Sequence, residues 1–141
     1  MTIRRVTGAE LAWAKRLLTQ EGFSGTSESS GEAAARIFEQ IHLQLDPLIG
    51  DSGVQALLAR SGKLAHPDYA FLAAQSADAG RRLRAHASSQ TPEAALESAA
   101  TLVAIFFSLI ITFIGERLTR EALREAWPTL EPLASPGASH E

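Results

Sequence analysis

The sequence contains no cysteine, which excludes disulfide bonds, thiolate nucleophiles and zinc–thiolate sites. It also lacks an excess of positive charge, because 13 lysines and arginines stand against 16 aspartates and glutamates. The net charge of −3 provides no basic footprint for nucleic acid. None of the four histidines is paired with another at a spacing typical of a helical metal site. The sequence therefore predicts no catalytic, cofactor-binding or metal-binding residue.

A secretory signal is also missing from the N-terminal segment, whose apolar residues are interrupted by Glu10, Lys15 and Arg16. We therefore expect a cytoplasmic protein, with the inner membrane as the alternative. A chain of 141 residues is long enough for one domain, which we place at residues 1–128. Residues 129–141 are rich in proline and small side chains and are expected to form a disordered tail.

The fold class follows from the periodicity of the apolar residues. No segment alternates apolar and polar residues over the length of a strand, so the sequence predicts an all-α fold. Thr7 is expected to cap a first helix. Residues 22–31 are rich in glycine and serine and predict a flexible linker. A second helix is expected over about 31–45, where Ile37 and Ile41 begin a regular apolar stripe with His42 at its boundary.

This pattern is interrupted by Pro47 and Gly50, before a third helix that Asp51 or Ser52 would cap. Two helices joined by a short turn resemble a helix-turn-helix, so a DNA-binding regulator is the second alternative for the function. The acidic composition and the scarcity of base-reading side chains argue against nucleic acid as the partner.

The most polar interior stretch is the segment at about 76–90, which follows a break and a short helix that Asp68 would cap. Arg81, Arg82 and Arg84 give this segment a basic cluster. Such a cluster is typical of a solvated helix end, and it would also suit an acidic partner or phospholipid headgroups.

The longest apolar stretch covers residues 98–115 without a single charge. As a helix it would extend about 27 Å, close to the ~30 Å hydrocarbon core of a bilayer. Thr91 followed by Pro92 and Glu93 is a strong signal for a helix start, which places this helix at about 92–114.

The apolar face of this helix changes sides near Gly115. Beyond that residue, three arginines continue the side that Phe106 and Phe113 occupy before it. A straight, half-exposed helix could not change faces in this way, so we expect a bend or break at Gly115.

Two structures remain compatible with the apolar helix. We favour a compact bundle of four or five helices around it, because the shorter helices carry apolar stripes that need cover. The alternative is a single-span, tail-anchored membrane protein with residues 98–115 in the bilayer.

Residues 113–128 read FIGERLTREALREAWP, an apolar run followed by I-G-E, L-T-R and a closing W-P. They resemble the end of a group of small bacterial all-helical proteins, and LIGDSGVQALLARS at 48–61 extends the resemblance. That group has no established activity, so the resemblance implies an autonomous cytosolic domain and assigns no catalytic residue. The group often has an apolar residue at the position of Arg120, so the arginine leaves the depth of burial there open.

Taken together, these features predict a non-enzymatic regulatory or adaptor protein that binds another protein or a second copy of itself. Arginine and tryptophan often dominate protein interfaces, which makes exposed residues of these types the candidates for partner contact. The partner-binding candidates are Arg81, Arg82, Arg84, Arg117, Arg120, Arg124 and Trp127.

Overall fold

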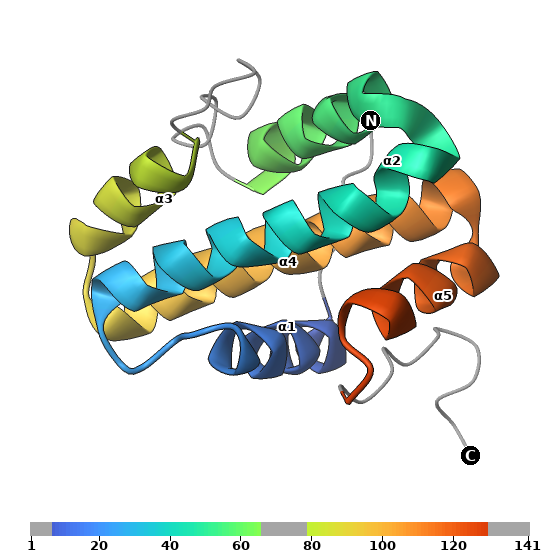
Figure 1. Cartoon of the computed structure of the whole chain (residues 1–141). Helices are drawn as coiled ribbons and strands as arrows, with labels where there is room; N and C mark the ends of the chain where they lie inside the picture. The colour runs from blue at the N-terminus through green and yellow to red at the C-terminus, as the bar shows by residue number, and fades with distance from the viewer. Residues whose placement is uncertain (1–6, 66–78, 130–141) are drawn as a thin grey trace.

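The computed structural model describes residues 7–65 and 79–129, which form five α-helices and no strand. The helices are α1 (Gly8–Gln20), α2 (Ser27–Ala65), α3 (Ala79–Ser88), α4 (Pro92–Ile114) and α5 (Glu116–Ala126). In Figure 1, α4 passes through the middle of the molecule, and it contacts each of the other four helices. The prediction of an all-α bundle around a central helix at about 92–114 is confirmed. The helix expected at Asp68 and residues 130–141 of the expected tail lie outside the described residues.

Local capping signals fix the starts of α1 and α4. The Thr7 hydroxyl accepts a hydrogen bond from the Glu10 N–H at 3.1 Å, and the Glu10 carboxylate accepts one from the Thr7 N–H at 3.0 Å. The Thr91 hydroxyl accepts from the Ala94 N–H at 3.2 Å, with Pro92 at the first helical position. Both caps are the ones that the sequence predicts.

The start of α2 differs from its prediction, because the helix begins at Ser27 inside the expected linker. The Ser29 N–H donates to the Thr26 hydroxyl at 3.2 Å, and the Ser29 hydroxyl donates to the Thr26 carbonyl at 2.8 Å. The first of these bonds satisfies one of the backbone N–H groups that a helix start leaves free, and the second fixes the orientation of the Ser29 hydroxyl. The linker prediction is therefore wrong for residues 27–31.

A close backbone contact joins α2 to α3 at Gly31. A Cβ at this position would lie 2.5 Å from the Leu83 carbonyl oxygen and 2.8 Å from the Arg84 Cα. Only glycine lets the two helices approach this closely, and the approach buries Leu83 and Ala87 of α3. Residues 79–88 of the polar segment, which was expected as a solvated helix end or loop, thus form a helix with one face in the core.

Within α2, a bend at Gly50 separates a proximal arm, residues 27–49, from a distal arm, residues 51–65. Gly50 has φ 80° and ψ 162°, and Pro47 precedes it in the helix. The His42 Nε2 lies 2.8 Å from the Asp51 Oδ1, which links the two arms. A helix-turn-helix joins its helices by a turn of three or four residues. The bend has a single non-helical residue, Gly50, in place of such a turn, and the DNA-binding alternative stays a prediction.

Adjacent aromatic side chains of α4 form the centre of the core. The Phe106 ring packs edge-on against Phe38 of α2, with 5.1 Å between centroids. The Phe107 ring packs edge-on against Trp13 of α1 at 5.3 Å. The helix is therefore covered on more than one side, and Phe106, Phe107 and Ile110 are fully buried.

The break predicted at Gly115 is present between α4 and α5. Gly115 has φ 96° and ψ 162°, a conformation that side-chain-bearing residues rarely adopt. Beyond the break, α5 buries Thr119, Ala122 and Leu123. The last turn of α4 is covered on one side only, because Ile114 packs partly against the core whereas Phe113 is 63% exposed.

Length and composition do not separate a core helix from a membrane span for α4. It is the one helix among the described residues that is long and apolar enough to cross a membrane, with a mean hydropathy of 2.1 over its most apolar window. In the bundle, 61% of that window is buried by the rest of the protein.

Replacing Gly31 with alanine should lower the free energy of unfolding by about 1–3 kcal/mol, because the new Cβ must displace the backbone of α3. Urea denaturation followed by circular dichroism measures this loss. Gly8→Ala is the matched control, since a Cβ at this helical position meets nothing within 4 Å. Equal stability of the two variants would contradict the close contact between α2 and α3.

Candidate functional site

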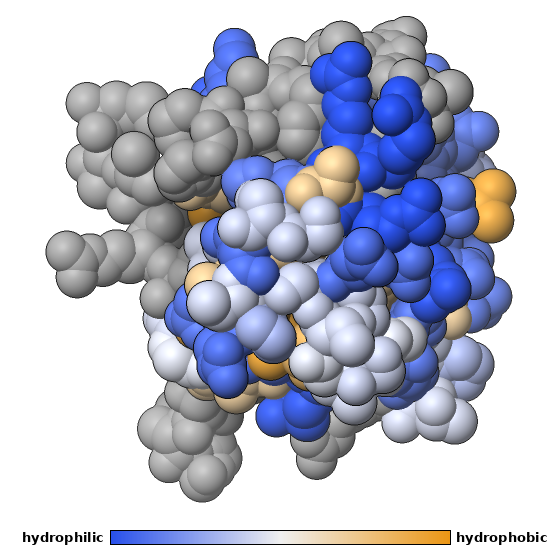
Figure 2. All heavy atoms as spheres, turned by 90° about the vertical axis from the view of Figure 1, so that its left-hand side faces the viewer, coloured by the Kyte–Doolittle hydropathy of each residue, from blue (hydrophilic) through white to orange (hydrophobic). Residues whose placement is uncertain are grey.

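The arginines predicted on α3 lie on its surface. Arg81, Arg82 and Arg84 are exposed, and the Arg84 Nη1 lies 3.2 Å from the Glu32 Oε2. This end of the bundle faces the viewer in Figure 2, where hydrophilic side chains lie beside others of intermediate hydropathy. The Ser27 hydroxyl donates to the Gln90 carbonyl at 2.7 Å, so the acidic first turns of α2 and α4 lie near one another at this end. Their acidic side chains limit the positive charge of the cluster.

The arginines predicted on α5 have two different environments. Arg117 and Arg124 are exposed. Arg120 is half-buried, with its Nη2 3.9 Å from the Glu116 Oε2 and its shielded Nε without a hydrogen-bond partner within the described ranges. A long side chain in this position covers apolar surface with its stem and keeps its charge near water.

Trp127 is wrong as a partner-contact candidate, because it is only 3% exposed. Its Nε1 donates to the Glu21 Oε2 at 2.8 Å, and its ring packs edge-on against Phe107 with centroids 6.4 Å apart. A helix continued through residue 127 would place Trp127 on the same face as Arg117, Arg120 and Arg124, which are three or four residues apart. In the structure α5 ends at Ala126, and the non-helical backbone of Trp127 (φ −137°, ψ 79°) accompanies a ring turned into the core.

A groove of about 630 Å³ lies between α2 and α5. Its apolar lining includes two leucines, Leu48 and Leu118, and Leu48 is 47% exposed. Both helices surround a concave apolar surface here, which is a usual setting for a binding site. The lining residues are Gln44, Pro47, Leu48, Leu118, Glu121, Ala122, Arg124, Glu125 and Pro128.

The charged residues of the groove are Glu121, Arg124 and Glu125, all on α5. Within residues 7–65 and 79–129, none of the three has an ion pair or hydrogen bond from its side chain. Arg124 is the one predicted contact residue that the structure places at this groove. The sequence carried no signal for the rest of the site, because residues 44–48 and 118–128 meet only through the tertiary fold.

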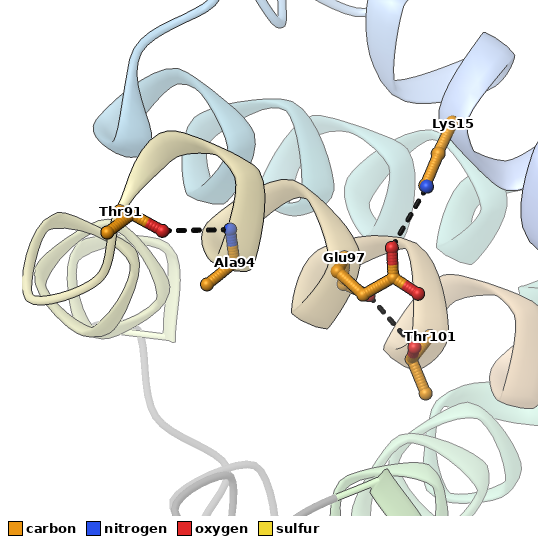
Figure 3. A network of polar contacts seen from close by, with 5 residues as sticks. All are labelled: Lys15, Thr91, Ala94, Glu97 and Thr101. Carbon is orange, nitrogen blue, oxygen red and sulfur yellow. Dashed lines mark hydrogen bonds and ion pairs between the residues drawn. The ribbon is translucent and has the colours of Figure 1, made fainter.

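Other polar contacts lie outside the groove, either between two helices or within one of them. The Lys15 Nζ on α1 lies 2.9 Å from the Glu97 Oε1 on α4, as Figure 3 shows. The Thr101 hydroxyl in the same view donates to the Glu97 carbonyl at 2.9 Å.

In the part of the chain that the structure describes, no group of three or more histidine, aspartate or glutamate side chains could hold a metal ion. The groove is therefore the strongest candidate site.

Replacing Glu21 with alanine should lower the free energy of unfolding by about 1–3 kcal/mol, because the indole N–H of buried Trp127 loses its acceptor. Urea denaturation and the NMR signal of the indole N–H measure the change. Glu21→Gln is the control, since its amide oxygen can still accept the bond and the loss should be smaller. A glutamine variant as unstable as the alanine variant would argue against this hydrogen bond.

Comparisons of the chain with protein-family models, with curated proteins and with solved structures find no match. The resemblance of residues 113–128 to a group of small bacterial proteins stays a prediction. The role of the groove has to follow from its own geometry and chemistry.

Proposed function

We propose that this protein is a small, non-enzymatic regulatory or adaptor protein that binds another protein through the groove between α2 and α5. The observation that supports the proposal is an apolar concave surface whose leucine, Leu48, is about half exposed. Apolar surface of this kind, with charged residues at its edge, is typical of interaction sites.

Two residues of the groove would contribute to binding a partner: Leu48 through its apolar surface, and Arg124 through a charge that orients the partner. Complete burial of an exposed leucine side chain contributes about 1.5–3 kcal/mol, so covering Leu48 fully would supply part of that range. Arg124 lies at the same groove with a guanidinium that has no partner among the described residues. Buried arginines and apolar anchors at the centre of an interface often dominate its energy.

Leu48→Asp should reduce capture of the partner from a lysate of the native host at least about tenfold, which corresponds to about 1.4 kcal/mol. Quantitative mass spectrometry of the proteins retained on the immobilised chain measures this. Leu43→Asp is the matched control, because Leu43 is also on α2 and 69% exposed but does not line the groove. Equal loss with both variants, or no loss with either, would remove the groove from the proposal.

We further infer that the protein acts in the cytoplasm as a folded bundle, with α4 as its core helix. Phe106 and Phe107 support this inference, because both are fully buried against aromatic side chains of other elements. The membrane anchor at residues 98–115 is the alternative, and the length and hydropathy of α4 are compatible with it.

Cell fractionation separates the two locations. For a cytoplasmic bundle, we expect the protein in the supernatant after an alkaline wash of the membranes. A chain that stays in the pellet and is released only by detergent would favour the anchor. Thermal unfolding of the detergent-free supernatant protein, followed by circular dichroism, serves as the control that the released material is folded.

A further inference from the structure

The charges around the groove are distributed unevenly between its two walls. The α5 wall carries Glu121 and Glu125, spaced four residues apart, together with Arg124. The α2 wall contributes Gln44, Pro47 and Leu48, none of which is charged. The lining therefore has two carboxylates and one guanidinium, which gives it a net negative charge.

These two carboxylates are available to a ligand. Across the described ranges neither Glu121 nor Glu125 forms an ion pair or a side-chain hydrogen bond within the protein. Both are exposed, so a partner does not have to break an existing contact to reach them. Charges at the rim of an interface mainly determine which partners are accepted and how quickly they associate.

The shape of the groove suits a helix. The α5 residues Leu118, Glu121, Ala122 and Glu125 recur at helical spacing along one wall, and the last turn of the proximal arm of α2 forms the other. An amphipathic helix lies in such a groove with apolar residues three and four positions apart. Its apolar side chains would contact Leu48 and Leu118, and cationic side chains beside them would reach the two carboxylates.

A second copy of this chain fits the groove less well. In a symmetric dimer the same surface forms both sides of the interface, so α5 of each copy would lie either parallel or antiparallel to the other. A parallel pair in register brings Glu121 opposite the Glu121 of the other chain. The lining residues 118, 121, 125 and 128 are evenly placed about their centre. An in-register antiparallel copy therefore brings Glu121 opposite the Glu125 of the other chain. Like charges placed opposite each other disfavour either arrangement.

We propose that the occupant of the groove is a basic amphipathic helix of the partner, with an apolar stripe bordered by lysine or arginine. The juxtaposition that carries this inference is the apolar pair Leu48 and Leu118 beside the free carboxylates Glu121 and Glu125. The inference rests on the proposed function, because it names the chemistry of the partner at the same site.

Two synthetic helical peptides test the charge preference. Both carry leucine at positions i, i+3, i+4 and i+7, and they differ only in having lysine or glutamate along the edges of that stripe. Fluorescence polarisation at physiological and low salt measures their binding to the full chain. We expect the lysine peptide to bind at least about tenfold more tightly than the glutamate peptide, and Leu48→Asp to weaken it by a similar factor.

Charge reversal on the protein gives the sharper test. Glu121→Lys combined with Glu125→Lys should invert the preference, so that the glutamate peptide binds more tightly. The matched control combines Glu39→Lys with Asp46→Lys, which changes the net charge equally at exposed α2 positions that do not line the groove. This control should keep the original preference for the lysine peptide.

Several outcomes would overturn the basic helix. Two concern the wild-type chain: equal binding of the two peptides, or failure of the lysine peptide to bind. The third is an inversion of the preference that the control variant also shows. The fourth is a dimer of the free chain that dissociates when Leu48 is replaced by aspartate. In each of these cases the proposed function is judged separately by capture of the natural partner. Loss of that partner with Leu48→Asp, but not with Leu43→Asp, would keep the groove as a binding site for a ligand of different charge.

Discussion

Everything else in this fold depends on the burial of two neighbouring aromatic residues, Phe106 and Phe107. Consecutive side chains of a helix point about 100° apart, so burying both requires cover from two directions. Phe38 of α2 supplies the cover on one side, and Trp13 and Trp127 supply it on the other. The amphipathic helices are therefore arranged around α4, and Trp127, which directly follows α5, connects the end of that helix to the same core.

The sequence predicts those parts of the fold that local chemistry determines. Thr7 and Thr91 cap helices through hydrogen bonds within four residues, and Gly115 breaks a helix whose apolar face changes sides. The start of α2 combines local bonds between Thr26 and Ser29 with contacts that are distant in the sequence. Gly31 looks like a linker residue until α3 packs against it, since its lack of a side chain serves a backbone contact with Leu83.

The candidate site was predictable only in part, for a similar reason. Exposure of the arginines on α3 and α5 follows from their charge, and all of them except half-buried Arg120 are exposed. Trp127 was misplaced because the sequence did not show that α5 ends one residue before it. The groove could not be found at all, because Leu48 and Leu118 stand 70 residues apart and neither belongs to a motif with a chemical meaning.

The central position of α4 also determines the order in which the core can form during translation. Residues of α1 and α2 leave the ribosome before residues 92–114, although their apolar sides pack on that later helix. Ile37, Ile41 and Leu45 therefore stay without the cover of α4 until the ribosome has also released residues 92–114. Transiently uncovered apolar surface is what chaperones recognise and what drives aggregation. The nascent chain is thus at its most vulnerable in the interval between the synthesis of α2 and that of α4.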